Sequence, residues 1–432
     1  MYVLVDCDNC FVSCERVFQP ELKGRPVVVL SNNDGCVVAR SNEAKALGIK
    51  MGVPLYQIQG LVAAKGVQLR SSNYTLYADL SNRIMSILRQ EAPVVEVYSI
   101  DEAFLDLRMM GEDYDYEAFG HHLVQKIGQW VGMPVSIGIA PTRTLAKMAS
   151  WYAKHYPGYR KVCYLSTDVK REKALRLFDV AEVWGVGWRR KDRLYAVGIH
   201  TAWDLVQKPA EWIRREMSVT GLRTWRELQG EDCIPYQLQP RRQTICTSRS
   251  FAEPVTTLKE LEMYVSNYAS RCAAKLRREH SVCSLVTVFA NTSPFRQDLP
   301  QYSPSLTLTL QTPVSSTPEI VGTALKALRL FFREGYQFKR AGVIVSATSD
   351  ANAVQTNLFD EIPAEQRARF DKLSAVIDKI NVRMGADTLK MGVQQLPKDE
   401  RTGKDTTWRD GIRHDYRSRN YTTDINEILE VE

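Results

Sequence analysis

Residues 97–107, VYSIDEAFLDL, are a strand-like apolar run that contains two adjacent carboxylates, Asp101 and Glu102. Successive side chains of a regular strand point to opposite faces, so two neighbouring acids of an unbroken strand cannot serve one site. We therefore predict that the strand breaks into a turn at Ile100–Asp101–Glu102–Ala103 and resumes at Phe104. A hairpin over 94–107 would then project both acids from its tip. A solvated turn is the alternative, because acids are common in turns.

The chain has 432 residues, which at about 100–200 residues per domain suggests two to four domains. Its 44% hydrophobic and 25% charged residues are ordinary for a globular protein, and its net charge of +7 favours polyanionic partners. No apolar run approaches the roughly 18 residues needed to span a membrane. The opening MYVLVDCDNC lacks a basic start and is not a signal peptide. Nine cysteines without a secretion signal indicate reduced thiols and a cytoplasmic protein.

Three of the cysteines, Cys7, Cys10 and Cys14, have the spacing C-x2-C-x3-C. This spacing is compatible with zinc or an iron–sulfur cluster, with a fourth ligand such as Cys36. The same positions fall on one face of a helix, where small buried thiols of a core explain them equally well.

The first 165 residues alternate between apolar strands and amphipathic helices. Strands are predicted over 2–6, 25–30, the two arms of the 94–107 hairpin, and 135–140; helices are predicted over 10–18, up to about Gly48, 74–90, 116–131 and 142–154. This order indicates a mixed sheet covered by helices, an α/β or α+β layer architecture.

From about residue 166 the pattern changes to short helices. Residues 181–199, AEVWGVGWRRKDRLYAVGI, have the form of a helix–hairpin–helix that turns at Gly185–Val186–Gly187. Such a turn can direct backbone N–H groups toward a phosphate, and the basic residues after it supply charge: Arg189, Arg190, Lys191 and Arg193. An ordinary helical hairpin with a glycine cap is the alternative.

Beyond a polar connector at 232–242, the predicted order is strand 244–250, helix 258–279, strands 283–290 and 305–312, helix 318–334 and strand 341–347. This βαββαβ order is the split-βαβ, ferredoxin-like pattern. Residues 349–432 are polar, with one predicted helix over 364–381 and a densely charged stretch at 398–420 that we expect to be partly disordered.

Asp6 ends the first strand, while Asp101 and Glu102 are predicted at a hairpin tip in the same layer. Converging carboxylates raise one another's pKa unless a cation neutralises them. Oxygen-only ligands suit Mg²⁺, and two such ions can activate a hydroxyl and stabilise a leaving pyrophosphate. We therefore predict a two-Mg²⁺ site at these acids.

Several segments together resemble the motifs of Y-family, lesion-bypass DNA polymerases. They are VDCDNCFVSCE (5–15), YSIDEAFLDL (98–107), IGIAPTRTLAKMASWYAK (137–154) and VWGVG (183–187). Two others, VVVLSNNDGCVVARSNEAKALGIKMG and SSNYTLYADLSNRIM, resemble the UmuC-type members of that family, and the resemblance extends from residue 1 to about 360.

The resemblance implies an α+β right-hand polymerase that copies damaged DNA inaccurately in the SOS response. The palm would be residues 1–30 and 74–165, the fingers 31–73, the helix–hairpin–helix thumb 166–232, the little finger 243–348, and a C-terminal tail 349–432. In the thumb, DNA contacts are expected at Gly185, Gly187, Arg189, Arg190 and Lys191.

The family pattern also assigns residues of the site. Asp6, Asp101, Glu102 and the backbone carbonyl of Cys7 would hold two Mg²⁺ ions, whereas Asp8 matches a position that is not a ligand. Phe11 matches the steric gate, an aromatic ring that collides with a 2′-hydroxyl; UmuC-type members more often carry Tyr there. Lys154 matches a lysine that grips the triphosphate. Asn42 and Lys45 replace a common Tyr and Arg, and Lys45 retains charge for a phosphate without the bidentate fork of arginine.

The segment QTNLF, whose anchors are Gln355, Leu358 and Phe359, resembles the peptide that docks bacterial polymerases on the sliding clamp. A helix-start contact before 364–381 is its alternative explanation. The resemblance implies as partners primer-template DNA, dNTPs, the clamp, a processed UmuD-type dimer and a RecA filament, in a bacterial cytoplasm at the nucleoid. Two rival hypotheses remain from the sequence: a non-catalytic, clamp-tethered DNA-binding scaffold that keeps the fold, and a cysteine-cluster metalloprotein. A nucleotidyl cyclase would have no use for the thumb or the clamp peptide.

Overall fold

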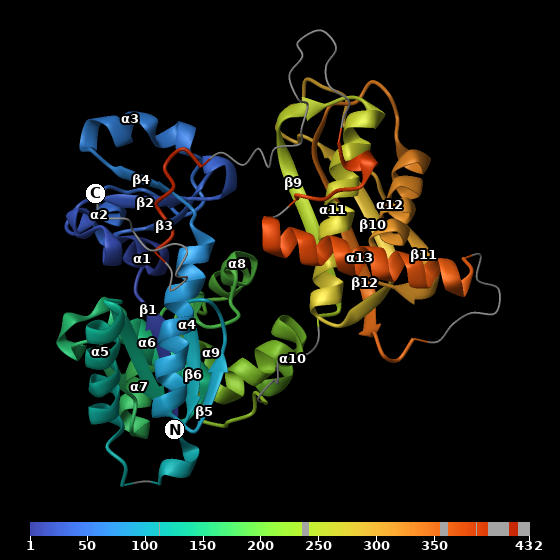
Figure 1. Cartoon of the computed structure of the whole chain (residues 1–432). Helices are drawn as coiled ribbons and strands as arrows, with labels where there is room; N and C mark the ends of the chain where they lie inside the picture. The colour runs from blue at the N-terminus through green and yellow to red at the C-terminus, as the bar shows by residue number, and fades with distance from the viewer. Residues whose placement is uncertain (112, 236–241, 355–361, 386, 396–413, 422–432) are drawn as a thin grey trace. The chain divides into compact units, whose positions relative to one another are not determined.

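The computed structural model of the chain describes residues 1–111, 113–235, 242–354, 362–385, 387–395 and 414–421 (Figure 1). The chain divides into two compact units, one formed by residues 1–237 with 412–432 and the other by residues 238–411. Each unit has its own hydrophobic cores and is described by itself.

A five-stranded sheet organises the first unit. In spatial order its strands are β5 (Val94–Val97), β6 (Glu102–Asp106), β1 (Tyr2–Cys7), β7 (Val135–Ala140) and β8 (Val162–Tyr164). The central strand β1 is antiparallel to both of its neighbours, whereas β7 and β8 are parallel. The predicted mixed sheet is therefore confirmed, with β8 as a strand that the sequence pattern did not predict.

Helices cover both faces of this sheet. Because side chains alternate along β1, Val3 and Val5 enter the core beneath helices α1, α4 and α5, whereas Tyr2 and Leu4 enter the core beneath α6. The helices confirm four predicted elements: α1 (Cys10–Phe18), α4 (Tyr74–Glu91), α5 (Tyr116–Val131) and α6 (Arg143–His155).

A second, three-stranded sheet lies between β1 and α4 in the sequence, in the order β3 (Val37–Arg40), β2 (Val27–Leu30) and β4 (Gln68–Ser71). It has a small core of its own together with α2 (Asn42–Ala46) and α3 (Leu55–Lys65). The predicted strand at 25–30 belongs to this sheet, so a palm–fingers boundary after residue 30 would divide the sheet. The sequence pattern did not predict β3, α3 or β4.

Short helices follow the five-stranded sheet: α7 (Asp168–Leu177), α8 (Trp188–Ala196), α9 (Ala202–Val206) and α10 (Ala210–Leu228). The second helix of the predicted helix–hairpin–helix is α8. The residues before its glycine turn form only a 3-10 turn, Val180–Glu182, rather than the expected helix, because Asp179 caps it and Val183 already has extended backbone angles.

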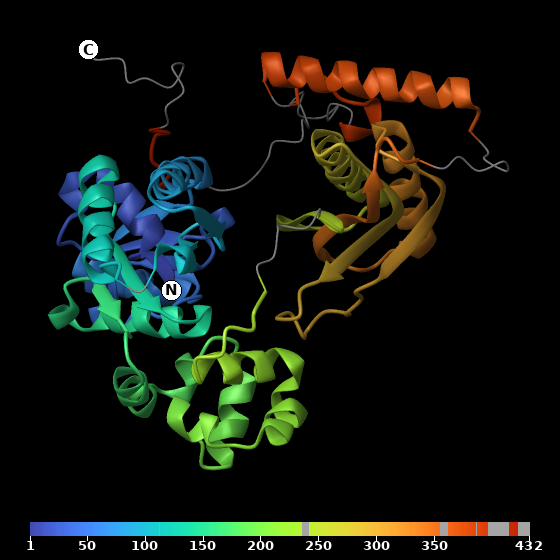
Figure 2. The ribbon, with the colours of Figure 1, turned by 90° about the horizontal axis from the view of Figure 1, so that it is seen from below.

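The second unit is built on a four-stranded antiparallel sheet with strand order β11-β10-β12-β9. Along the chain its elements are β9 (Thr244–Val255), α11 (Leu258–Arg278), β10 (Ser281–Thr292), β11 (Ser305–Val314), α12 (Thr317–Phe331) and β12 (Phe338–Asp350). Strand β12 separates β9 from β10, and β10 separates β11 from β12, so both βαβ units are split as predicted. Helix α13 (Ala364–Met384) packs on α12 on the helical side of the sheet (Figure 2).

Residues 414–421 are part of the first unit and pack against it, which corrects the expected disorder for this part of the tail. The rest of the stretch predicted to be disordered (398–413) and the clamp-like peptide with Gln355, Leu358 and Phe359 lie outside the described residues. Within the described segments, no helix is long and apolar enough to cross a membrane.

The packing of α6 on the sheet depends on Gly138 in β7. A methyl group added there would lie 2.1 Å from both the carbonyl oxygen of Ala146 and the amide nitrogen of Ser150, which belong to the backbone of α6. We expect Gly138→Ala to destabilise the first unit by about 3 kcal/mol, because a backbone clash cannot be relieved by a rotamer change.

This prediction is checked by urea unfolding followed by tryptophan fluorescence, since seven of the eight tryptophans precede residue 238. Gly128→Ala in α5 is the matched control: its added methyl meets nothing within 4 Å. Helix propensity should make this change neutral or stabilising by about 0.5–1 kcal/mol. Equal stabilities of the two variants would contradict the packing argument.

Candidate active site

Two of the predicted metal ligands face each other across neighbouring strands. Asp6 on β1 is the direct register partner of Glu102 on β6. Directly opposite residues of an antiparallel pair project from the same face of the sheet, so the two side chains share one site. Glu102 is thus the first residue of β6, and the predicted turn over 100–103 is corrected: the turn ends at Asp101.

Asp101 is held beside this pair by the loop that joins β5 to β6. Its carbonyl oxygen accepts a hydrogen bond of 2.9 Å from the amide of Cys7. The Ser99 hydroxyl accepts from the amides of Asp101 and Glu102 and donates to an Asp101 carboxylate oxygen. The break in the strand lets two neighbouring acids approach one region, because Asp101 is no longer bound by strand alternation.

Two lysines of α6 bind these carboxylates. Lys154 Nζ lies 2.8 Å from Asp6 Oδ1, and Lys147 Nζ lies 2.9 Å from Glu102 Oε2. The lysines are seven residues apart, about two helical turns, and therefore occupy one face of the helix. Lys147 was not predicted from the sequence, although its spacing from Lys154 was a signal that could have found it.

Burial has the largest effect on the pKa of Asp6. Burial raises the pKa of Asp6 to about 6; Lys154 opposes this rise, and the nearby charges of Glu102 and Asp8 add to it. Burial alone would lower the pKa of Lys154, but the surrounding carboxylates, chiefly Asp6, raise it on balance. The site thus concentrates negative charge that a cation must balance.

Asp8, which is not among the predicted ligands, has polar partners of its own. Its carboxylate accepts from the Ser136 hydroxyl at 2.9 Å and pairs with Lys161 Nζ at 2.7 Å. It lies 3.7 Å from Lys154 Nζ. Lys161 was not predicted, because it follows α6 in a loop and meets Asp8 only in the folded chain.

The donor set fits a hard divalent cation, because carboxylate and carbonyl oxygens are the ligands that Mg²⁺ prefers. In the described residues no three His, Cys, Asp or Glu side chains are already gathered around one point that could hold a metal ion. Asp6 and Glu102 instead bind lysines. Binding of a cation would require these carboxylates to release Lys154 and Lys147.

Phe11 is the second residue of α1 and follows Asp6 by five residues. It is half-buried and stacks on Tyr77 of α4, with ring centroids 4.5 Å apart and planes 14° apart. The rings of Phe11 and Tyr74 are nearly perpendicular, with centroids 5.8 Å apart. Phe11 is therefore packed at the margin of the core rather than within it, and part of its ring is accessible.

Polar residues from the second sheet meet the start of α1. Lys45 Nζ donates to Asn9 Oδ1 at 2.7 Å, and Asn9 in turn donates to Asn42 Oδ1 at 3.1 Å. Burial lowers the pKa of Lys45, with further contributions from the charges of Lys154 and Arg40. The positive side chains of Arg40, Lys45 and Lys154, from β3, α2 and α6, thus gather near Asp6. The sequence analysis predicted neither Arg40 nor Asn9, the partner of Lys45, as part of the site.

The glycine turn predicted for DNA contacts is exposed. Gly185 has a positive φ of 88°, and its carbonyl accepts from Arg190 Nη1 at 2.8 Å. Gly187 caps the start of α8, where its carbonyl accepts from the amides of Arg190 and Lys191. These residues and Arg189 place positive charge and the N-terminal end of α8 at one exposed turn.

The three clustered cysteines are buried and free. Cys7 ends β1, while Cys10 and Cys14 lie on the core-facing side of α1. This arrangement agrees with the core interpretation of their spacing.

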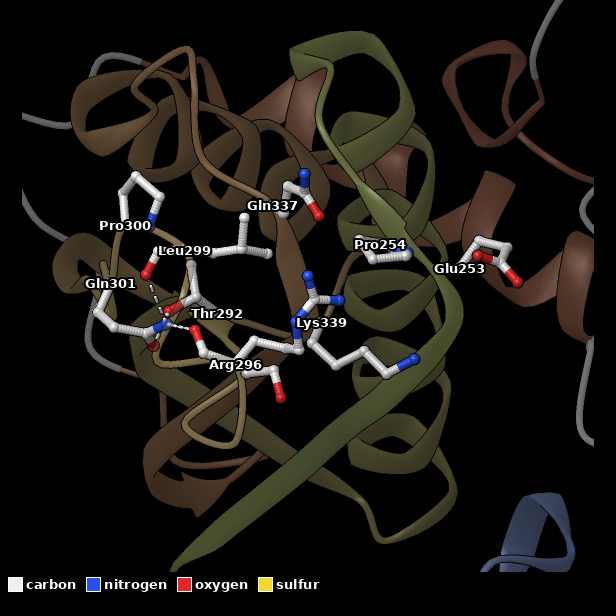
Figure 3. A pocket seen from close by; sticks show the side chains of 10 residues that line it. Glu253, Pro254, Thr292, Arg296, Leu299, Pro300, Gln301, Gln337 and Lys339 are labelled. Atoms are coloured by element: carbon white, nitrogen blue, oxygen red, sulfur yellow. Dashed lines mark hydrogen bonds between the residues drawn. The ribbon is translucent and has the colours of Figure 1, made fainter.

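The C-terminal unit has a separate hollow of about 260 Å³ next to the β10–β11 loop, lined by Thr292, Arg296, Gln301, Lys339 and neighbouring residues (Figure 3). None of the predicted site residues lines it. The loop is fixed by Gln301, whose side chain donates to the carbonyls of Arg296 and Leu299.

Comparison with known proteins identifies the family. A family model described as impB/mucB/samB matches residues 5–151, and the model of the C-terminal domain of the same family matches residues 242–358. Protein UmuC of Salmonella typhimurium strain LT2 is 40% identical over the full length of both chains. The chain belongs to the impB/mucB/samB family.

Other relatives agree with this result. Protein ImpB of Salmonella typhimurium is 43% identical over 384 residues, which cover 88% of this chain and 90% of that protein. DNA polymerase IV of Desulfatibacillum aliphaticivorans is 27% identical over 90% of this chain and 96% of its own. A third family model, described as a domain of unknown function, matches residues 371–431.

Solved structures confirm the predicted fold. A Y-family DNA polymerase chimera of Dbh and Dpo4 superposes with a TM-score of 0.66 at 22% identity, covering 81% of this chain and 99% of that one. An insertion ternary complex of Dbh DNA polymerase gives 0.55 at 22% identity, over 80% and 98%. The fold is that of the Y-family DNA polymerases, while the residue bounds of palm, fingers and thumb stay a prediction.

The buried cysteines generate a prediction about bound metal. We expect protein purified without chelators to contain far less than one equivalent of zinc or iron by elemental analysis, because in the described residues these thiols are packed in the core and no three potential ligands are gathered around one point. Cys10→Ser should leave the metal content unchanged. One equivalent of zinc or iron that disappears in Cys10→Ser would establish the cysteine-cluster hypothesis instead.

Proposed function

We propose that the protein is an error-prone translesion DNA polymerase that adds a dNMP, directed by a template, to a primer 3′-hydroxyl opposite damaged DNA. The observation that carries this proposal is the placement of Asp6 and Glu102 opposite each other on adjoining strands of a Y-family polymerase fold, with Asp101 beside them in the loop before β6. Membership of the family places this activity in DNA repair and SOS mutagenesis.

A DNA polymerase of this family depends on a divalent metal, and we propose two Mg²⁺ ions held by Asp6, Asp101, Glu102 and the carbonyl of Cys7. Bound there, the ions would lower the pKa of the primer 3′-hydroxyl and stabilise charge on the leaving pyrophosphate. The protein's own part is to hold the carboxylates on rigid strands and to keep them balanced by lysines before substrate arrives.

Lys154 and Lys45 are proposed to bind the triphosphate. Lys154 is positively charged next to Asp6, so it can exchange its carboxylate partner for a phosphate oxygen without leaving the site. Lys45 is held by Asn9, which gives Asn42 and Asn9 the role of orienting it. A lysine binds phosphate as a point charge, and neither contact needs bidentate geometry.

Phe11 is proposed as the steric gate for the sugar. Its ring stacks on Tyr77 and has a T-shaped contact with Tyr74. Moving the ring away from a 2′-hydroxyl would break these contacts. The aromatic contacts are worth about 0.5–1.5 kcal/mol each beyond burial.

Template and primer contacts are proposed at the α8 turn (Gly185, Gly187, Arg189, Arg190 and Lys191) and in the C-terminal unit, whose residues 242–358 match the family's C-terminal domain. The basic side chains of α11 are a weaker candidate, because Arg277 pairs with Asp378 and Arg271 with Asp387. Docking of residues 355–359 on the sliding clamp, and contacts with a UmuD-type dimer and a RecA filament, belong to the same proposal and rest on the sequence resemblance.

Primer extension past an abasic site tests the activity. With Mg²⁺, dNTPs, clamp, UmuD-type dimer and RecA filament present, we expect Asp101→Asn/Glu102→Gln to reduce extension by more than about 100-fold, since the carboxylates stabilise charge only as the reaction proceeds. Asp106→Asn, on the same strand but paired with Arg108, is the matched control and should extend normally. Activity that survives in the double variant would place the metals elsewhere, and an inactive wild-type protein would favour the clamp-bound scaffold.

The gate is tested by ribonucleotide incorporation. We expect Phe11→Ala to reduce the preference for dCTP over CTP by about 10-fold or more, because the collision with the 2′-hydroxyl is lost. The ratio of kcat/KM values for the two nucleotides is the measurement. Phe11→Tyr keeps the ring and should keep the preference; a preference unchanged in Phe11→Ala would remove the gate from Phe11.

A further inference from the structure

The C-terminal segment 414–421, here called the C-terminal strap, continues the edge of the three-stranded sheet (Figure 1). The amide of Ser71, the last residue of β4, donates to the carbonyl of Tyr416 at 3.1 Å, and the amide of Tyr416 donates to the Ser71 hydroxyl at 3.0 Å. Asp415 N also donates to Asp34 Oδ2 at 3.0 Å. The strap thereby covers an open strand edge of the kind that proteins usually protect.

The strap then surrounds Asn73, which is fully buried at the point where the chain leaves the three-stranded sheet for α4. Asn73 Nδ2 lies within hydrogen-bond distance of three strap acceptors: the Ser418 carbonyl at 3.3 Å, the Ser418 hydroxyl at 3.1 Å and the Arg419 carbonyl at 3.2 Å. Its Oδ1 caps α4 by accepting from Leu76 N and also accepts from Arg417. A buried amide with this many partners is strongly fixed in orientation.

From Asn73 a continuous chain of contacts leads to the proposed gate. Asn73 begins α4, and one turn later Tyr77 stacks on Phe11 and donates to Glu15 Oε1 at 2.7 Å. Burial raises the pKa of Glu15, while the hydroxyls of Tyr77 and Ser418 oppose the rise, which puts the strap next to the same carboxyl. At the other end of α1, the Tyr421 ring stacks on Phe18 with centroids 4.6 Å apart.

The strap therefore contacts both helices that hold the gate ring: α1 at Phe18 and Glu15, and α4 at its cap. It also belongs to the region matched as a domain of unknown function, residues 371–431. The described parts of that region belong to different units. Helix α13 pairs with α11 and α12 of the second unit through Asp378 and Ser374, whereas the strap belongs to the first unit.

We propose that the C-terminal strap is a positioning element for sugar selection: by fixing Asn73 and α1, it holds the Tyr77–Phe11 stack rigid against a 2′-hydroxyl. This inference rests on the proposed role of Phe11. The strap touches no reacting atom, so its effect is on discrimination rather than on the chemical step. A displacement of about 1 Å at such a contact is enough to change a rate by orders of magnitude.

The test uses the full chain with Tyr416→Pro/Tyr421→Ala. Proline removes the N–H that binds Ser71, and alanine removes the ring on Phe18. We expect the dCTP-to-CTP ratio of kcat/KM to fall about 10-fold, while kcat for dCTP changes little. Hydrogen exchange should accelerate at residues 71–77 and 414–421, most directly at the Ser71 amide.

Two variants are controls. Tyr421→Phe keeps the stacked ring and should keep both the ratio and the protection. Arg419→Ala removes a side chain that makes no hydrogen bond or ion pair within the described residues, while its carbonyl still reaches Asn73; it too should behave as wild type.

The outcomes separate this inference from the proposed function. If Phe11→Ala lowers the ratio but the released strap does not, the strap has no part in sugar selection and only covers the sheet edge. If Phe11→Ala itself leaves the ratio unchanged, the gate proposal fails first. A fall in the ratio without faster exchange at residues 71–77 and 414–421 would overturn the positioning role, because the strap would still be attached. A fall in kcat for dCTP equal to the fall in the ratio would indicate general destabilisation and would also count against that role.

Discussion

The site depends on ion pairs that join helix α6 to two neighbouring strands. Asp6 and Glu102 share one face of the sheet and are largely buried, so each raises the free energy of the other's charge. Lys154 and Lys147 compensate for this repulsion, and they can do so only because α6 approaches β7 as closely as Gly138 permits. The close packing of α6 on the sheet therefore also keeps the charges of the candidate site balanced. A shift of α6 would separate both lysines from both carboxylates.

Cys7 and Phe11 depend on the position of Asp6 because they follow it closely in the chain. Both lie within five residues of Asp6, so the strand that presents the Asp6 carboxylate leads directly into the helix that carries the proposed gate ring. The other side of the ring is supported by α4, whose start is fixed by a segment more than 340 residues away. The proposed nucleotide site is therefore assembled from the beginning of the chain, the exit of the three-stranded sheet and the C-terminal strap.

Helices and strands with a clear apolar pattern of their own were predictable from the sequence. Helix 10–18 was predicted to the residue, and the helix predicted around 116–131 was found there, because their apolar positions recur at helical spacing. Strands β3 and β4 were not, because they are four residues long and half-buried, and α3 has apolar residues without a clear stripe. The predicted end of the turn lay two residues too late, since strand pairing with Asp6, rather than the sequence of the hairpin, sets where β6 begins.

By itself the sequence named the candidate residues: Asp6, Asp101 and Glu102 from the acids that interrupt an apolar strand, and Phe11 and Lys154 from the resemblance to family motifs. It also gave the split-βαβ order of the C-terminal unit, because strand and helix periodicities are properties of neighbouring residues. Only the tertiary structure decided that Lys147 and Lys161 neutralise Glu102 and Asp8, that Asn9 orients Lys45, and that residues 414–421 close the edge of β4. Those interactions join residues far apart in the chain, and their formation depends on close packing and burial that no local pattern encodes.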